Sequence, residues 1–154
     1  MIPYRQILLA TDFSDTARDA LDHAVGIAEE ANATLHLLHV VEEVGYWEGF
    51  DLKRFPSDDV YEELRESARI ALDDLVERTA DRDVEHRVEV REGKPFLEII
   101  RAAKEIPADL IVVGSHGQSG LAETLFGSTA EKVVRKAPCA VLVVRHPEHT
   151  FAMP

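Results

Sequence analysis

Residues 109–129, DLIVVGSHGQSGLAETLFGST, decide the fold of this chain. The apolar run 110–113 predicts a buried strand, and glycines and hydroxyl side chains follow it at a regular spacing. In order, they are Gly114, Gly117, Gly127, Ser128 and Thr129. Glycine has no Cβ, so the backbone can approach a phosphate closely, and a helix that starts after the last glycine attracts the same anion. The stretch therefore indicates a strand, a phosphate-binding turn and a helix N-terminus.

Two commoner phosphate-binding patterns are absent from the sequence. Gly93 and Lys94 are followed by Pro95 and lack the upstream glycine that the pattern G-x-x-x-x-G-K-[ST] requires. The dinucleotide pattern G-x-G-x-x-G does not occur. The sequence therefore disfavours both a P-loop NTPase and a dinucleotide-binding protein of that type.

Apolar runs alternate with helical periodicities along the rest of the chain. The other strands are predicted at 7–10, 35–41, 84–90 and 140–144. Helices are predicted at 17–28 with Ser14 as N-cap, at 60–79 with Ser57 as N-cap, at 95–103 with Pro95 in the first turn, and at 130–137 with Ser128 as N-cap. In the run 84–90, valines alternate with charged residues, as in an edge strand with one solvated face. The order βαβαβαβαβ predicts an α/β fold, a single-domain doubly wound parallel sheet of five strands.

In such a sheet, ligands bind beyond the carboxyl ends of the strands, at the point where the strand order reverses. Three segments of this chain are predicted to meet there. They are residues 10–12 after the first strand, Val40 and Val41 at the end of the second, and residues 114–120 after the fourth. Their convergence favours a nucleotide site more strongly than any one of them alone.

The glycine spacing, together with Thr11-Asp12-Phe13-Ser14, resembles the ATP-binding branch of the universal stress protein family, and the resemblance extends from end to end. It implies a Rossmann-like fold of the adenine nucleotide alpha hydrolase type with strand order 3-2-1-4-5. It also implies a universal stress protein domain over 1–146, a short tail over 147–154, and ATP as ligand with Mg²⁺ or Mn²⁺. In the family, the residue at Ala10 touches the nucleotide through its backbone, and the main chain at Val40 meets the adenine edge.

The candidate nucleotide-binding residues are Ala10, Thr11, Asp12, Val40, Gly114, Ser115, His116, Gly117, Gln118, Ser119, Gly120, Gly127, Ser128, Thr129 and Ala130. Three of them have structural alternatives. Asp12 either orders ribose hydroxyls or metal-bound water, or serves the start of the following helix. The Ser128 hydroxyl either caps its helix or meets phosphate. His116 has no second ligand at metal-binding spacing, so a buried structural histidine is favoured over a metal ligand.

The composition of the chain disfavours two classes of binding partner. The chain has 154 residues, of which 45% are hydrophobic and 30% charged, and its formal net charge is −12. Such acidity disfavours nucleic acid and anionic membrane surfaces as partners, because both would repel the chain. The single cysteine, Cys139, cannot form an internal disulfide, and no apolar stretch is long enough to span a bilayer. The N-terminus also lacks the pattern of a signal peptide, so we expect a cytoplasmic protein without membrane insertion.

Residues 42–57 form a long predicted loop that carries Tyr46, Trp47, Phe50 and Phe55. Three interpretations of this loop remain open: it covers the adenine of the nucleotide, it contacts a second subunit, or its aromatic side chains pack as a small cluster of their own.

The sequence offers no evident base or nucleophile, so we expect a regulatory protein rather than an enzyme, with at most slow ATP hydrolysis. Nucleotide occupancy would then act as a switch for dimer or partner contacts, with a regulatory protein as unknown target. The alternative is a dimeric adaptor of the same family that binds no nucleotide. The run 140–144, AVLVV, is apolar throughout and lies at a sheet edge in the implied strand order, which predicts a homodimer through this strand.

Overall fold

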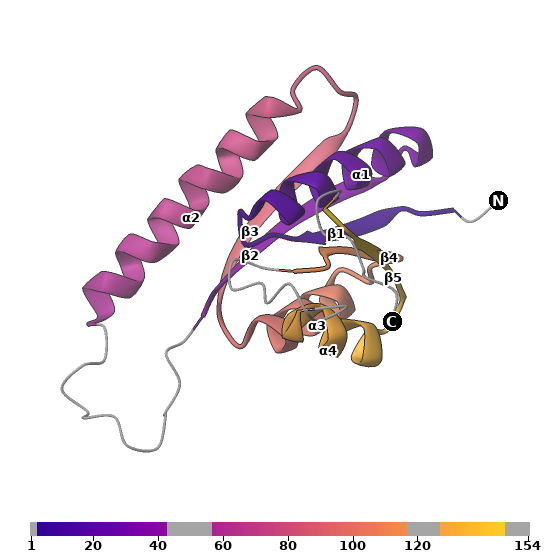
Figure 1. Cartoon of the computed structure of the whole chain (residues 1–154). Helices are drawn as coiled ribbons and strands as arrows, with labels where there is room; N and C mark the ends of the chain where they lie inside the picture. The colour runs from indigo at the N-terminus through magenta and orange to yellow at the C-terminus, as the bar shows by residue number, and fades with distance from the viewer. Residues whose placement is uncertain (1–2, 43–56, 117–126, 147–154) are drawn as a thin grey trace.

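A computed structural model describes residues 3–42, 57–116 and 127–146. These residues form one five-stranded parallel sheet with the order β3-β2-β1-β4-β5, flanked by helices (Figure 1). The elements are β1 (Gln6–Ala10), α1 (Asp15–Ala31), β2 (Thr34–Glu42), α2 (Asp58–Arg78), β3 (Glu85–Gly93), α3 (Pro95–Glu105), β4 (Leu110–Gly114), α4 (Ser128–Lys136) and β5 (Ala140–Val144). The predicted fold class and strand order are confirmed.

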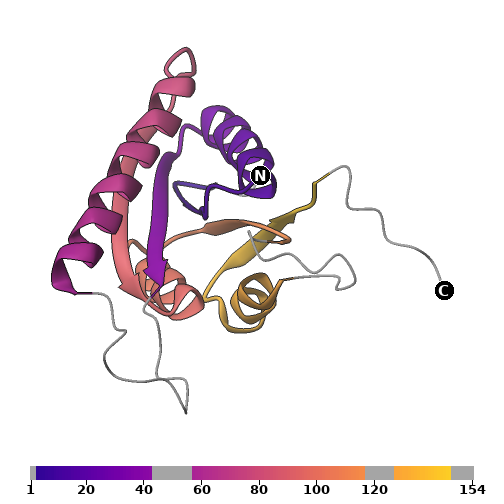
Figure 2. The same cartoon turned by 60° about the vertical axis from the view of Figure 1, so that its left-hand side comes forward.

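Helices cover both faces of the sheet, which explains why the central strands are continuous apolar runs. Figures 1 and 2 show α1 and α2 on one face and α3 and α4 on the other. Along β1 the side chains alternate between these layers: Ile7 and Leu9 pack in the core with α1 and α2, whereas Leu8 packs in the core with α3 and α4. All three are almost completely buried.

Local signals in the sequence set the helix starts. The hydroxyl of Ser14 accepts a hydrogen bond from the backbone N–H of Ala17 at 3.2 Å, which caps α1 as predicted. Ser57 occupies the N-cap position of α2 but makes no side-chain capping bond. Pro95 is in the first turn of α3, where its missing N–H costs nothing.

The predicted pattern departs from the structure at β3 and α2, and also at the start of α4, which is described with the site below. The sequence predicts the third strand at 84–90, whereas β3 extends over Glu85–Gly93, since its pairing with β2 continues beyond the alternating valines as far as Glu42. The apolar stripe of α2 includes Val60 and Leu64, yet these side chains are 41% and 45% exposed. The stripe is buried only from Ala68 onward, because the N-terminal turns of α2 reach past the sheet (Figure 1).

In the described part of the chain, no helix combines the length and apolar character needed to cross a membrane. Residues 43–56, which hold the four aromatics of the predicted loop, and the predicted tail 147–154 lie outside the described residues.

Candidate functional site

Thr11, which follows β1, holds the carboxyl ends of β1 and β2 together. Its N–H donates to the carbonyl of Leu38 at 2.9 Å, and its carbonyl accepts from Nδ1 of His39 at 2.8 Å. Its hydroxyl accepts from the N–H of Phe13 at 3.1 Å. Thr11 is 7% exposed, and a buried polar group needs a hydrogen-bond partner, so each of these bonds stabilises the folded structure. His39 therefore serves as a strand-end anchor.

Asp12 supports the turn between β1 and α1. Its Oδ1 accepts a hydrogen bond from the N–H of Ser14 at 3.0 Å, the geometry of an Asx turn. The structural alternative for Asp12 is therefore realised in this structure, and a contact of the same carboxylate with ribose or metal-bound water stays a prediction.

Phe13 adopts an unusual backbone conformation at the same turn. Its φ is 64°, in the left-handed region that bulky side chains rarely occupy. The ring packs on the imidazole of His39 with a centroid distance of 4.6 Å and an interplanar angle of 30°. Strain of this kind persists only where the surroundings hold it, and it concentrates at functional sites.

Gly114 ends β4 and lies against the start of α1. A Cβ at this position would be 2.9 Å from Cγ2 of Thr16 and 3.3 Å from the backbone nitrogen of Ala17. The missing side chain therefore serves the packing of α1 onto β4. This finding adds a packing role to the phosphate approach that the sequence predicts for this glycine, and the phosphate role stays a prediction.

Ser115 and His116 continue from Gly114 into the core, with exposed fractions of 0% and 6%. The N–H of Ser115 donates to the carbonyl of Val144 at 2.8 Å, and its carbonyl accepts from the N–H of Gly127 at 2.6 Å. The hydroxyl of Ser115 lies 3.0 Å from Nδ1 of His116. The chain after β4 is thus joined to the end of β5 and to the start of α4, and His116 is a buried, hydrogen-bonded residue.

The prediction that Ser128 caps α4 is wrong by one position. Gly127 is the N-cap, with φ −64° and ψ 160°, and Ser128 is the first helical residue, exposed at the surface. Because glycine has no side chain, α4 has no side-chain cap, and its first internal bond runs from the N–H of Glu131 to the carbonyl of Gly127 at 3.0 Å. The N–H groups of residues 128–130 have no acceptor inside the helix, which is the arrangement that binds anions.

The structure brings most of the predicted site residues to one edge of the sheet. Val40 lies two residues beyond Leu38, the last residue of β2 that pairs with β1, and is 9% exposed. The segments 10–12, 114–116 and 127–130 meet at the same edge through the contacts described above. Gly117, Gln118, Ser119 and Gly120 lie outside the described residues.

Among residues 3–42, 57–116 and 127–146, no cluster of three or more His, Cys, Asp or Glu side chains could hold a metal ion. A magnesium ion carried by nucleotide phosphates needs only one or two protein carboxylates, since it keeps several waters. The side chain at this edge that fits such a role is Asp12.

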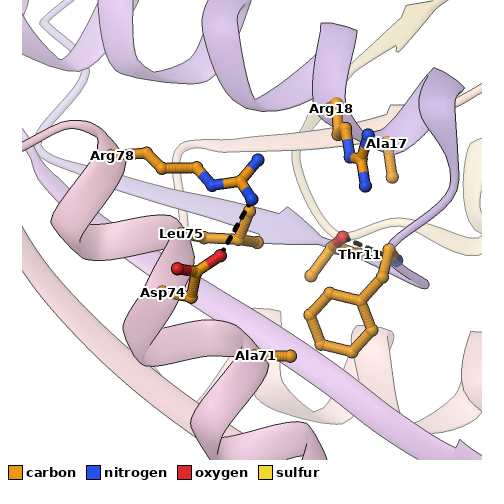
Figure 3. A pocket seen from close by; sticks show the side chains of 8 residues that line it. Thr11, Ala17, Arg18, Ala71, Asp74, Leu75 and Arg78 are labelled. Carbon is orange, nitrogen blue, oxygen red and sulfur yellow. Dashed lines mark hydrogen bonds and ion pairs between the residues drawn. The ribbon is translucent and has the colours of Figure 1, made fainter.

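Sequence reasoning missed a cavity beside this edge. It lies between α1 and α2, next to Thr11 and Phe13, and Arg18 and Arg78 reach into it (Figure 3). The helical periodicity places both arginines on exposed helix faces. Only the packing of α1 against α2 shows that they face the same cavity.

The fold agrees with that of a family of known proteins. The model of the universal stress protein family matches residues 3–145. The chain belongs to the universal stress protein family. Among curated relatives, a universal stress protein of Methanocaldococcus jannaschii, MJ0531, is 35% identical over 153 residues, which cover 94% of this chain and 84% of the relative.

Solved structures of universal stress proteins resemble it as well. UspA from Lactobacillus plantarum is 34% identical with a TM-score of 0.77, and the match covers 92% of this chain and 98% of that protein. A universal stress protein solved in complex with cAMP is 29% identical with a TM-score of 0.63, over 93% of this chain and 98% of that one. Nucleotide binding therefore occurs among the structural relatives of this universal stress protein.

Proposed function

We propose that this universal stress protein binds ATP at the carboxyl edge of its sheet and acts as a nucleotide-responsive regulator. The observation that carries the proposal is the convergence of the ends of β1 and β4 with the N-terminus of α4. The Gly127–Ser115 hydrogen bond of 2.6 Å and the close packing of Gly114 on α1 produce that convergence. It lies at the switch point between β1 and β4, where doubly wound folds bind nucleotides.

In this proposal each segment has one task. The N–H groups of residues 128–130 donate to phosphate oxygens, assisted by the positive end of the α4 dipole. The backbone at Val40 meets the adenine edge, and Ala10 and Asp12 contact the ribose or the water shell of a phosphate-bound Mg²⁺ or Mn²⁺. Residues 117–120 complete the phosphate turn. The cAMP complex of a relative supports this assignment of ligand class.

The proposed role is regulatory, with nucleotide occupancy acting as a switch for contacts with a second subunit or a regulatory protein. Two alternatives to this regulatory role remain. The protein is a slow ATPase, or it is a dimeric adaptor that binds no nucleotide. His116 supports the regulatory proposal, because a side chain 6% exposed and hydrogen-bonded to Ser115 is poorly placed to act as a general base.

The proposed subunit contact is β5. Within the described residues, the order β3-β2-β1-β4-β5 gives this strand a neighbour on one side only. Its sequence AVLVV offers no charge to oppose pairing, and residues 141–143 are only partly buried. Antiparallel pairing of two β5 strands would satisfy the outward N–H and C=O groups about a two-fold axis.

The test replaces Ser128 by proline and measures ATP affinity by calorimetry. Proline is favoured at the first helical position, so Ser128→Pro keeps α4 while removing one N–H donor and the hydroxyl. We expect the Kd for ATP to rise by about tenfold or more, the value of a hydrogen bond to a charged group.

Asp58→Pro is the matched control, because Asp58 starts α2 after an N-cap with φ −65° and ψ 161°, nearly the geometry of Gly127. This control should leave the affinity unchanged. An unaltered ATP affinity in folded Ser128→Pro would contradict the proposed phosphate site.

A further inference from the structure

The cavity between α1 and α2 adjoins the strand edge that holds the proposed nucleotide site, and Thr11 belongs to both. Its volume is about 120 Å³, and it lies on the face of the sheet that α1 and α2 cover (Figure 3). An engineered cavity of about 150 Å³ binds benzene, so this somewhat smaller space accommodates at most one small ring or a branched aliphatic group.

The walls of the cavity are mostly apolar. Ala17 of α1 and Ala71 and Leu75 of α2 line it, and Phe13 contributes an aromatic wall. Two of these positions carry only a methyl group, which leaves room between the helices. Such walls favour an apolar body in the occupant, because its burial removes hydrocarbon surface from water.

Two guanidinium groups from different helices complete the lining. Arg18 pairs with Asp15 at 3.5 Å and Arg78 pairs with Asp74 at 3.0 Å, so each arginine is paired within its own helix. Each guanidinium carries five N–H donors, and one carboxylate contact occupies only part of them. Figure 3 shows both side chains extending into the space between α1 and α2.

The donors around the cavity favour an occupant with one carboxylate. Asp15 and Asp74 balance the charges of the two arginines, so an occupant with a single negative charge is favoured over a dianion, and it binds through the guanidinium N–H groups that these two pairs leave available. A carboxylate matches the planar donor geometry of a guanidinium, whereas a phosphate dianion would meet the Asp74 carboxylate with an excess of negative charge. We propose that this cavity binds a small organic monocarboxylate with an apolar body no larger than a benzene ring.

The cavity is coupled to the proposed nucleotide site through Phe13 and Thr11. An occupant would pack on Phe13, whose N–H is bonded to the Thr11 hydroxyl and whose φ of 64° needs support. Thr11 lies between Ala10 and Asp12, so the same turn carries both sites. An occupant of the cavity would hold this turn in one conformation. ATP binding would then lose less conformational entropy in ordering the turn, so each ligand would strengthen the binding of the other. This coupling rests on the proposed function, whereas binding in the cavity does not.

The first test titrates the whole chain with benzoate in the absence of nucleotide and follows backbone amide resonances by NMR. We expect saturable shifts at residues 17, 71 and 75 with a Kd of about 1 mM or tighter, the range of a ligand of this size. Benzyl alcohol and inorganic phosphate are the matched probes for charge and for shape. Absence of shifts at these residues, or equal affinity for either matched probe, would overturn the proposal.

Variants then test the lining. Arg18→Met and Arg78→Met keep the aliphatic stem and should each weaken benzoate binding about tenfold. Arg87→Met is the control, since Arg87 is an exposed arginine on β3 that pairs with Glu85, and this variant should leave the affinity for benzoate unchanged.

Ala71→Leu fills the cavity and should abolish benzoate binding while the melting temperature stays that of the wild type. Benzoate binding that survives Ala71→Leu would assign the probe to another place and overturn the site.

The last arm measures ATP affinity with and without saturating benzoate. We expect ATP to bind about fivefold more tightly with benzoate, and benzoate to gain the same factor from ATP, since coupling is reciprocal. An ATP affinity that benzoate leaves unchanged would overturn the coupling. If ATP does not bind at all, the proposed function fails, while the benzoate shifts still decide the cavity.

Discussion

At the scale of single residues, the glycines of this chain have different physical roles. A Cβ at Gly26, inside α1, would meet nothing within 4 Å. Gly93 has φ 139°, and a Cβ there would lie 3.1 Å from Cγ of Glu98. At Gly114 the obstacle includes backbone, since the Cβ would lie 3.2 Å from the carbonyl carbon of Thr16. A helix backbone cannot rotate away as a flexible side chain does, so packing requires glycine at position 114, whereas the positive φ requires it at position 93.

Gly114→Ala should therefore lower the free energy of unfolding by about 1–3 kcal/mol, the usual cost of overpacking. Gly26→Ala is the matched control and should raise it by about 0.5–1 kcal/mol, because alanine loses less backbone entropy in a helix. Urea denaturation of both variants measures the difference. A Gly114→Ala protein as stable as the wild type would show that α1 is not held against β4 as described.

Two substitutions at Asp12 distinguish a structural role of its carboxylate from a role in ligand binding. Asp12→Asn keeps an oxygen that can accept from the N–H of Ser14, so stability should stay within about 0.5 kcal/mol of wild type. If the charge serves a ribose or a metal, this variant should still weaken ATP binding in the presence of Mg²⁺. Asp12→Ala should lower both stability and affinity. Equal ATP affinity in wild type and Asp12→Asn would leave Asp12 with the turn as its role.

At the scale of elements, a surface ion pair joins the end of α1 to the turn before β3. Glu29 accepts hydrogen bonds from the guanidinium of Arg82, with Nε at 2.9 Å, and from the N–H of Asp83 at 3.3 Å. The bond from Arg82 is the main cause that holds the pKa of Glu29 below its usual value of 4.5. The last turns of α1 are thus tied to the turn between α2 and β3, at the opposite end of α1 from Arg18 and the cavity.

The sign of the pH effect follows from this lowered pKa. The ionised form of Glu29 is favoured in the folded state, so its contribution is complete above pH 4.5 and is lost as the pH falls through the folded-state pKa. Arg82→Met should therefore be less stable than wild type at pH 7, with a gap that closes in acid. Thermal melts of both proteins across this range check it. A gap that stays constant down to the lowest pH would assign the effect to packing of the Arg82 side chain.

At the scale of the whole molecule, the two edges of the sheet differ in chemistry. On β3, Glu85 pairs with Arg87 and Glu89 pairs with Arg91, so this edge strand carries alternating charge. β5 carries no charged side chain from Ala140 to Val144. Charge on an edge strand opposes pairing with another chain, and an apolar edge permits it. The asymmetry favours β5 over β3 as the place where two subunits would join.

We accordingly expect the wild-type protein to sediment as a dimer at micromolar concentration. Val143→Pro removes a backbone donor and should give monomer or aggregate, because proline disrupts strand pairing. Glu89→Val removes a charge from β3 and serves as the control, with the dimer retained. Sedimentation velocity distinguishes these states, and a wild-type monomer at that concentration would rule out the proposed contact.

The alternation of elements was determined by the sequence itself, because burial on two faces demands continuous apolar runs and caps demand particular side chains. Leu110–Val113, the Ser14 cap and Pro95 in α3 all appear where the sequence predicts them. The glycine spacing likewise predicted a strand end and a helix start, which the hydrogen bond between Gly127 and Ser115 brings together, because strand ends and helix starts are local features.

Only the tertiary structure decided what these residues touch. Gly127 replaces Ser128 as the N-cap of α4, and the bond of its N–H to the Ser115 carbonyl shows how this start is held from outside the helix. The need for glycine at position 114 comes from Thr16, almost a hundred residues earlier in the chain. The cavity brings Arg18 and Arg78 together from separate helices. Such contacts depend on how distant elements pack in three dimensions, and no periodicity within a single element contains that information.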